Sequence, residues 1–248
     1  MASTAPPQNL PLSQAITIAA QAIGEVISGR SLTYVLEELE PQERPIVQSI
    51  TFDTFRRWTR SHALIKEFVP KPPSKPVEHV LAVAITLLLD RTDVAKKGYA
   101  THTIVNESVS ACGQYDETIY AKGLMNAVLR KVSAALDAQG EKRPDHNSVG
   151  ESYFPPWWIA NLRKNYPKSW QSICLQQSQR PPLTLRVNRR AISLVDYAAV
   201  LRAAQIEAQP IEQVANTLLD AALVIKEPIP VASILGFFDG LVSVQDAG

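Results

Sequence analysis

The chain has 248 residues, of which 46% are hydrophobic and 20% charged, so it can bury a core and its composition is not that of a disordered protein. Its 25 basic and 24 acidic residues give a net charge of +1, which excludes a protein that is basic or acidic throughout. The two cysteines exclude a disulfide scaffold and a cysteine-rich zinc module.

Residues 1–11 are polar and proline-rich, and we expect a disordered tail there. This segment has neither the basic flank nor the apolar stretch of an export signal. No apolar run in the sequence reaches the length that spans a bilayer. We therefore expect a cytoplasmic protein without a membrane segment.

Residues 12–138 carry apolar side chains at helical spacing, which predicts an all-α bundle. Ser13 is placed to cap the first helix, and Pro45 suits the first turn of a helix that reaches Phe68. Residues 77–89 are apolar nearly all round, which indicates a central buried helix. The predicted helices span about 13–27, 45–68, 77–89, 101–112 and 117–137.

Residues 139–150 are polar and rich in helix breakers, which is typical of a linker. Beyond this linker, alternation of apolar and polar residues appears for the first time, and we predict a small α+β domain over residues 151–248. Its predicted helices open at 155–158 and span 167–177 and 193–204, and its predicted strands span 183–188, 206–211, 222–225 and 241–245.

The nearly balanced net charge conceals an uneven distribution. Residues 51–131 have a net charge of +4 and residues 132–190 of +5, whereas the flanking segments 1–50 and 191–248 have −3 and −5. Such asymmetry is typical of a surface that binds a polyanion. The counts alone leave a chance fluctuation on a solvated surface equally open.

The basic residues form three clusters, which point to RNA or DNA because arginine forks match phosphate oxygens. The first cluster lies on one side of the predicted helix 45–68, the second is a polar stripe at four-residue spacing, and the third follows the strand at 183–188. Each cluster alone fits a solvated face or ordinary ion pairs, and a mid-helix asparagine is as typical of a buried hydrogen-bonding residue. The predicted RNA-binding residues are Arg56, Arg57, Arg60, Lys122, Asn126, Arg130, Lys131, Arg180, Arg186, Asn188, Arg189 and Arg190.

Catalytic and cofactor-binding patterns are missing. The four histidines are scattered without metal-ligand spacing, and neither a glycine-rich dinucleotide motif nor a phosphate loop is present. Cys112 and Cys174 have no base or cation at helical spacing, so we interpret both as buried structural residues. The sequence predicts no self-sufficient catalytic centre.

Three motifs, taken in order, resemble a known family. The segments THTIVNESV at 101–109 and KGLMNAVLR at 122–130 are similar to the signature of the NusB-like RNA-binding domain fused to bacterial 16S rRNA (cytosine-C5)-methyltransferases of the RsmB (Sun/Fmu) type. FPPWW at 154–158 and RPPLTLRVN at 180–188 look like the next domain of those enzymes. LGFFDG at 235–240 and VQDAG at 244–248 resemble the segment that leads into their methyltransferase fold.

The resemblance implies a NusB-like helical bundle and a small α+β domain that bind 16S rRNA without metal or membrane. In the family, a following Rossmann-like domain binds S-adenosylmethionine and carries two catalytic cysteines. Cys112 and Cys174 match neither context. We therefore expect that domain to be absent from this chain, with no catalytic or cofactor-binding residue in 1–248 and no activity without the missing part.

Two other functions remain open at this point. A NusB-like regulatory module, acting through RNA and protein partners in transcription antitermination, would explain the helical part but not residues 150–248. An oligomerisation or docking domain with an incidental basic face is the simpler alternative, because fold analogy does not decide function.

Overall fold

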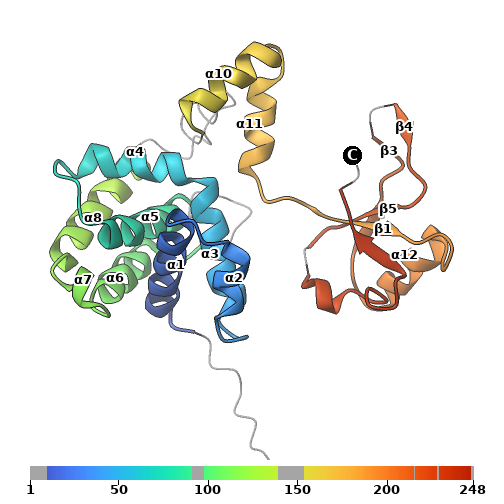
Figure 1. The fold of residues 1–248 in the computed structure, drawn as a ribbon, viewed down its shortest axis with the longest axis horizontal. Helices are drawn as coiled ribbons and strands as arrows, with labels where there is room; N and C mark the ends of the chain where they lie inside the picture. Colours follow the sequence, from blue (N-terminus) through green and yellow to red (C-terminus); the bar gives the residue numbers. More distant parts are fainter. Residues whose placement is uncertain (1–9, 91–97, 139–153, 215, 228, 247–248) are drawn as a thin grey trace, which may run out of the picture. The chain divides into compact units, whose positions relative to one another are not determined.

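The computed structural model describes residues 10–90, 98–138, 154–214, 216–227 and 229–246 (Figure 1). The chain divides into two compact units, residues 1–179, called the helical unit below, and residues 180–248, called the sheet unit. Most of the predicted tail and the whole predicted linker at 139–150 lie outside the described residues. The division at 179/180 groups the two helices that follow the predicted linker with the helical unit.

The described residues of the helical unit form helices and no strands, as the periodicity predicts. The helices are α1 (Leu12–Ile27), α2 (Leu32–Glu37), α3 (Arg44–Arg56), α4 (Trp58–Phe68), α5 (Lys75–Asp90), α6 (Thr101–Cys112), α7 (Asp116–Ile119), α8 (Lys122–Ala138), α10 (Pro156–Asn165) and α11 (Trp170–Ser178). The prediction of an all-α first part is therefore confirmed.

Helix α5 is the centre of the bundle. Every side chain from His79 to Asp90 is buried, and α1, α3, α4, α6 and α8 pack around it. The apolar sides of α1 and α8, with Ile16, Met125 and Leu129 fully buried, complete the core. Each such side chain stabilises the fold by about 1.5–3 kcal/mol relative to an exposed position. The predicted central buried helix is confirmed.

Three predicted details of the helical unit are wrong. The single helix 45–68 is interrupted at Arg57, whose backbone leaves the helical region at φ −110° and ψ 13°. Helix α1 begins after Pro11 and not after Ser13, whose backbone N–H donates to Glu107 Oε2 at 3.0 Å. The helix predicted for 117–137 is two helices, α7 and α8. In each case a tertiary contact or a local turn outweighs helix propensity.

The sheet unit contains a four-stranded antiparallel sheet in the order β2-β5-β1-β6 (Figure 1). Its elements are β1 (Leu183–Val187), α12 (Leu194–Ala203), β2 (Ala208–Pro210), β3 (Gln213–Val214), β4 (Thr217–Leu218), β5 (Ala222–Ile225), the 3-10 turn η1 (Val231–Ser233) and β6 (Val242–Val244). Strands β3 and β4 form a separate hairpin that the sequence analysis did not predict.

One face of the sheet builds the core of this unit. Leu185, Val187 and Leu223 pack against Tyr197 and Leu201 of α12, and all five are buried. The Tyr197 hydroxyl donates to the Leu235 carbonyl at 2.8 Å, and burial raises the pKa of this tyrosine. The apolar alternation of the strands therefore places α12 on one face and leaves the polar residues on the other.

Gly236 closes the loop between η1 and β6. Its φ of +70° lies in the left-handed region, and a Cβ at this position would stand 2.4 Å from the Leu241 side chain. The LGFFDG segment therefore needs glycine at this turn.

Candidate nucleic-acid interface

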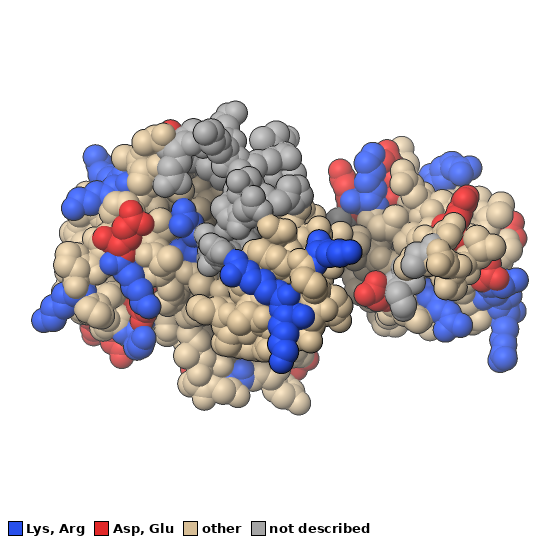
Figure 2. Space-filling model, turned by 90° about the horizontal axis from the view of Figure 1, so that it is seen from above, with Lys and Arg blue, Asp and Glu red and all other residues tan. Residues whose placement is uncertain are grey.

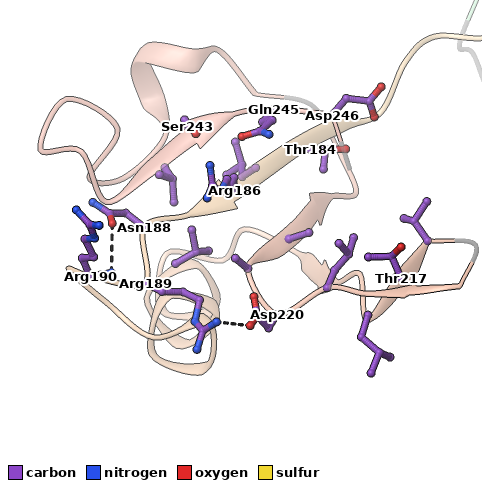
Figure 3. A pocket seen from close by; sticks show the side chains of 18 of the residues that line it. Thr184, Arg186, Asn188, Arg189, Arg190, Thr217, Asp220, Ser243, Gln245 and Asp246 are labelled. Atoms are coloured by element: carbon purple, nitrogen blue, oxygen red, sulfur yellow. Dashed lines mark hydrogen bonds and ion pairs between the residues drawn. The ribbon is translucent and has the colours of Figure 1, made fainter. Parts of the chain in front are cut away.

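Strand β1 presents polar side chains on the face of the sheet opposite α12. The alternation that buries Leu185 and Val187 turns Thr184 and Arg186 the other way, and Arg186 is exposed. Figure 3 shows Arg186 standing on this face near the middle of the strand. The two-residue alternation along β1 therefore directs Leu185 and Val187 into the core and the Arg186 cation away from it.

Strand β6 and the residue that follows it add two polar side chains beside Arg186. Ser243 pairs with Arg186 across the ladder, and the Gln245 backbone N–H donates to the Thr184 carbonyl at 3.1 Å. Ser243 and Gln245 are exposed on the same face (Figure 3). Ser243 and Gln245 are not among the predicted RNA-binding residues, although the alternation of the strand predicted at 241–245 could have indicated them.

An open groove of about 1120 Å³ follows this polar face. It lies between strands β1 and β6 and the hairpin β3–β4, so all of its lining belongs to the sheet unit. Its acidic residues are Asp220 and Asp246. Hydroxyl, amide and guanidinium groups lie along the groove, so it offers hydrogen-bond donors and acceptors to a polar ligand.

The turn after β1 carries the remaining predicted residues of this unit. Asn188 is engaged through its side chain, since Nδ2 donates to the Gly240 carbonyl at 2.9 Å and Oδ1 accepts the Arg190 N–H at 3.2 Å. Arg189 forms an ion pair with Asp220 (Figure 3). Arg186 and Arg190 are exposed and have no ion pair within the described part of the chain. Arg180, also predicted, precedes β1 and is exposed.

The first predicted cluster, on α3 and α4, is arranged differently from the prediction. The break at Arg57 means that Arg56, Arg57 and Arg60 do not share one side of one helix. Arg56 Nη1 lies 2.7 Å from Asp53 Oδ1, and Arg57 pairs with Asp90 at the end of α5. The Arg57 and Asp90 side chains are only 13% and 10% exposed. Two of the three cations therefore have carboxylate partners inside the helical unit.

The predicted polar stripe on α8 is confirmed. Lys122, Asn126 and Arg130 are exposed, as is Lys131, while Met125 and Leu129 face the core. The side chains of Arg130 and Asn126 are joined by a hydrogen bond of 3.0 Å from Nε to Oδ1. The alternative of a buried Asn126 is wrong, and the stripe offers an amide and three cations to solvent.

The described residues contain no group that matches a catalytic or metal centre. No cluster of histidine, cysteine and carboxylate side chains suited to a metal ion is found among them. Burial raises the pKa of the Cys112 thiol to about 11 against the positive charge of Lys122, and it raises that of Cys174 as well. Both thiols are therefore protonated at neutral pH, in agreement with the prediction that they are structural.

The histidines of α4 and α5 pack on one tryptophan. The ring centroid of Trp58 lies 4.0 Å from that of His62 and 6.3 Å from that of His79. His62 Nε2 is 3.1 Å from Glu78 Oε1, a pair that joins the two helices. Both histidines therefore take part in the packing between α4 and α5.

Comparisons with known families match both units. The NusB family matches residues 13–134, and the "Methyltr_RsmF/B-like, ferredoxin-like domain" matches residues 154–232. In the described residues, no helix combines the length and hydrophobicity needed to cross a bilayer.

Similar proteins carry one name. The chain is 32% identical over 233 residues to ribosomal RNA small subunit methyltransferase B of Pseudomonas syringae pv. tomato, covering 92% of this chain and 50% of that protein. It is 30% identical over 240 residues to the protein of that name from Escherichia coli O6:H1, with 93% and 52% covered. The probable homologue of Coxiella burnetii is 29% identical over 225 residues, with 91% and 50% covered. The chain thus spans about half the length of the curated relatives it matches.

A solved structure shares the fold. The crystal structure of PH0851 aligns with a TM-score of 0.59 at 16% identity, covering 98% of this chain and 54% of that one. At this identity the likeness concerns the fold alone. The family matches and the named relatives lead to one assignment: the chain is a NusB-family domain followed by an RsmF/B-type ferredoxin-like domain, the pair that forms the N-terminal half of ribosomal RNA small subunit methyltransferase B.

Proposed function

We propose that this chain binds 16S rRNA and holds it for methylation at cytosine C5. The observation that carries the proposal is the polar sheet face, where exposed Arg186 and Arg190 stand beside hydroxyl and amide groups along an open groove. Phosphate contacts from such arginines supply affinity, and amides and hydroxyls along the groove suit unpaired bases. The relatives' name, which concerns methylation of small-subunit ribosomal RNA, supports the choice of ligand.

The transfer of the methyl group needs a site that the described residues do not supply. A Rossmann-like domain places its cofactor at the carboxyl ends of parallel strands. Every strand pair described here is antiparallel, and these residues therefore do not fit S-adenosylmethionine. We propose that the methyltransferase chemistry belongs to the half of the relatives that this chain does not span, and we expect a cytoplasmic location beside the ribosome.

The test is RNA binding across a salt series. A 16S rRNA helical fragment with an unpaired loop is expected to bind with an affinity that falls as salt rises, because released counterions drive the contact. The double variant Arg186→Glu/Arg190→Glu should weaken binding and reduce the salt slope by about 1 per lost phosphate contact. Arg202→Glu, which changes an exposed arginine of α12, is the matched control.

Two outcomes would contradict the proposal. One is an affinity that stays constant between low and high salt, and the other is an equal loss for the control and the double variant. Methyl transfer from tritiated S-adenosylmethionine to rRNA by this chain alone would contradict the second part of the proposal.

A NusB-like regulatory module is the second candidate function, and the family match over residues 13–134 favours it. This candidate function does not explain the ferredoxin-like domain matched at residues 154–232. The rRNA-binding proposal accounts for both units.

A further inference from the structure

Helix α10 opens with an exposed tryptophan. Trp157 is 66% exposed, whereas its neighbour Trp158 packs on Phe154 with ring centroids 4.5 Å apart and Ile159 is 5% exposed. The helix therefore has a buried side, and Trp157 stands on the other side. A single exposed apolar residue is common, so its surroundings decide whether it has a function.

Two polar residues continue the line of Trp157 along the helix. Asn161 and Lys164 follow at four and seven residues, which is the spacing of one helix side, and both are exposed. At 1.5 Å rise per residue, Trp157 and Lys164 lie about 10 Å apart along the axis. The stripe of Trp157, Asn161 and Lys164, called the α10 stripe below, thus presents an aromatic ring, an amide and a cation in order.

The hairpin of α10 and α11 carries charge of one sign. Residues 154–179 include three basic residues, Arg163, Lys164 and Lys168, and no acidic one. Figure 2 shows that lysine and arginine side chains stand out from several parts of the surface and are interspersed elsewhere with acidic ones. Within the hairpin of α10 and α11, the Arg163 guanidinium lies over the Trp170 ring at 4.4 Å, and Tyr166 is 54% exposed.

We infer that the α10 stripe is a stacking site for an unpaired RNA base. This inference rests on the proposed function and extends it to a surface of the helical unit that the predicted RNA-binding residues do not include. The indole stacks on the base, which every base permits because each has a π face. The Asn161 amide can donate to and accept from a base edge, and Lys164 meets a phosphate.

A protein partner fits this surface less well. Trp157, which is 66% exposed, is one apolar side chain on this side of the helix, whereas the apolar patches that mark protein interfaces are contiguous and span several hundred Å². The other members of the α10 stripe are polar. A polyanion with an exposed aromatic base satisfies both the ring of Trp157 and the positive charge of Lys164.

Fluorescence anisotropy of labelled RNA tests the inference. The probe is a fluorescein-labelled oligouridine of about 12 nucleotides, with an RNA duplex of equal length for comparison. We expect Trp157→Ala to weaken oligouridine binding at least about fivefold, with the duplex affinity and the salt slope unchanged. Trp157→Phe should restore most of the affinity because the ring remains.

The matched control is an exposed aromatic residue in acidic surroundings. Tyr34 on α2 is 65% exposed and is followed by Glu37, Glu38 and Glu40, so Tyr34→Ala should leave oligouridine binding unchanged. As an independent readout, RNA should protect Trp157 from quenching by acrylamide, seen as the difference between wild type and Trp157→Phe. The other three tryptophans are only partly exposed.

The outcomes separate this inference from the proposed function. Salt-dependent RNA binding that Trp157→Ala leaves unchanged would overturn the inference alone. No RNA binding by the wild type would overturn both. An equal loss for oligouridine and duplex would also overturn it, because a stacking site acts on unpaired bases.

Discussion

The ion pair between Arg57 and Asp90 offers a direct test of how the helical unit is held together. Asp90→Asn keeps the size of the side chain but removes its charge, and it leaves the Arg57 guanidinium at 13% exposure without the carboxylate. Removal of one partner from a buried pair typically costs about 3–5 kcal/mol. For a unit of this size each kcal/mol lowers Tm by about 2–4 °C, so we expect a fall of about 10 °C.

The measurement is urea unfolding followed by circular dichroism at the helical band, with Tm from a thermal scan. Glu38→Gln is the control, because it removes one partner from the exposed pair between Arg30 and Glu38, and should leave the midpoint unchanged. The double variant Arg57→Met/Asp90→Leu should recover most of the lost stability, since two apolar side chains leave no buried charge. An Asp90→Asn midpoint equal to that of the wild type would refute the reasoning.

Two further predictions concern titratable groups of the helical unit. Burial lowers the pKa of His79 below 6.5, so the folded state favours the neutral ring. The neutral ring's contribution to the free energy of unfolding is fully present above pH 6.5, the pKa in the unfolded chain. It is lost as the pH falls through the lowered pKa of the folded chain. The urea midpoint should therefore fall more for the wild type than for His79→Gln between about pH 7 and about pH 5.5, and equal falls would contradict this. Because the pKa of the Cys112 thiol is raised to about 11, iodoacetamide at about pH 8 should label it only after denaturation. Mass spectrometry checks this, and rapid labelling of the native chain would be the opposing result.

The fold was predictable where one local pattern dominates. Residues 77–89 are apolar nearly all round and match α5, and the alternation at 183–188 matches β1. No glycine or proline next to Arg57 indicates the break in the helix, and Asp90, which pairs with Arg57, lies 33 positions away in the sequence. The hairpin β3–β4 has two-residue strands, too short for a period to be seen.

The candidate site was predictable only in part, for a related reason. Helical spacing indicated that Lys122, Asn126 and Arg130 share a face, and they do. Asp53 stands three residues before Arg56 on the same helix, so helical spacing could have indicated their ion pair. No local pattern could indicate that Asp90 neutralises Arg57, or that Ser243 stands opposite Arg186. Those relations depend on tertiary packing and strand register.

The two outer strands of the sheet have a consequence for solubility. Strand β2 ends at Pro210, which has no amide hydrogen to offer an additional strand, and β6 is three residues long. Both borders are thus poor templates for pairing between copies. Within the described residues of the sheet unit, the polar face is thus available to a ligand while the borders discourage aggregation through strand addition.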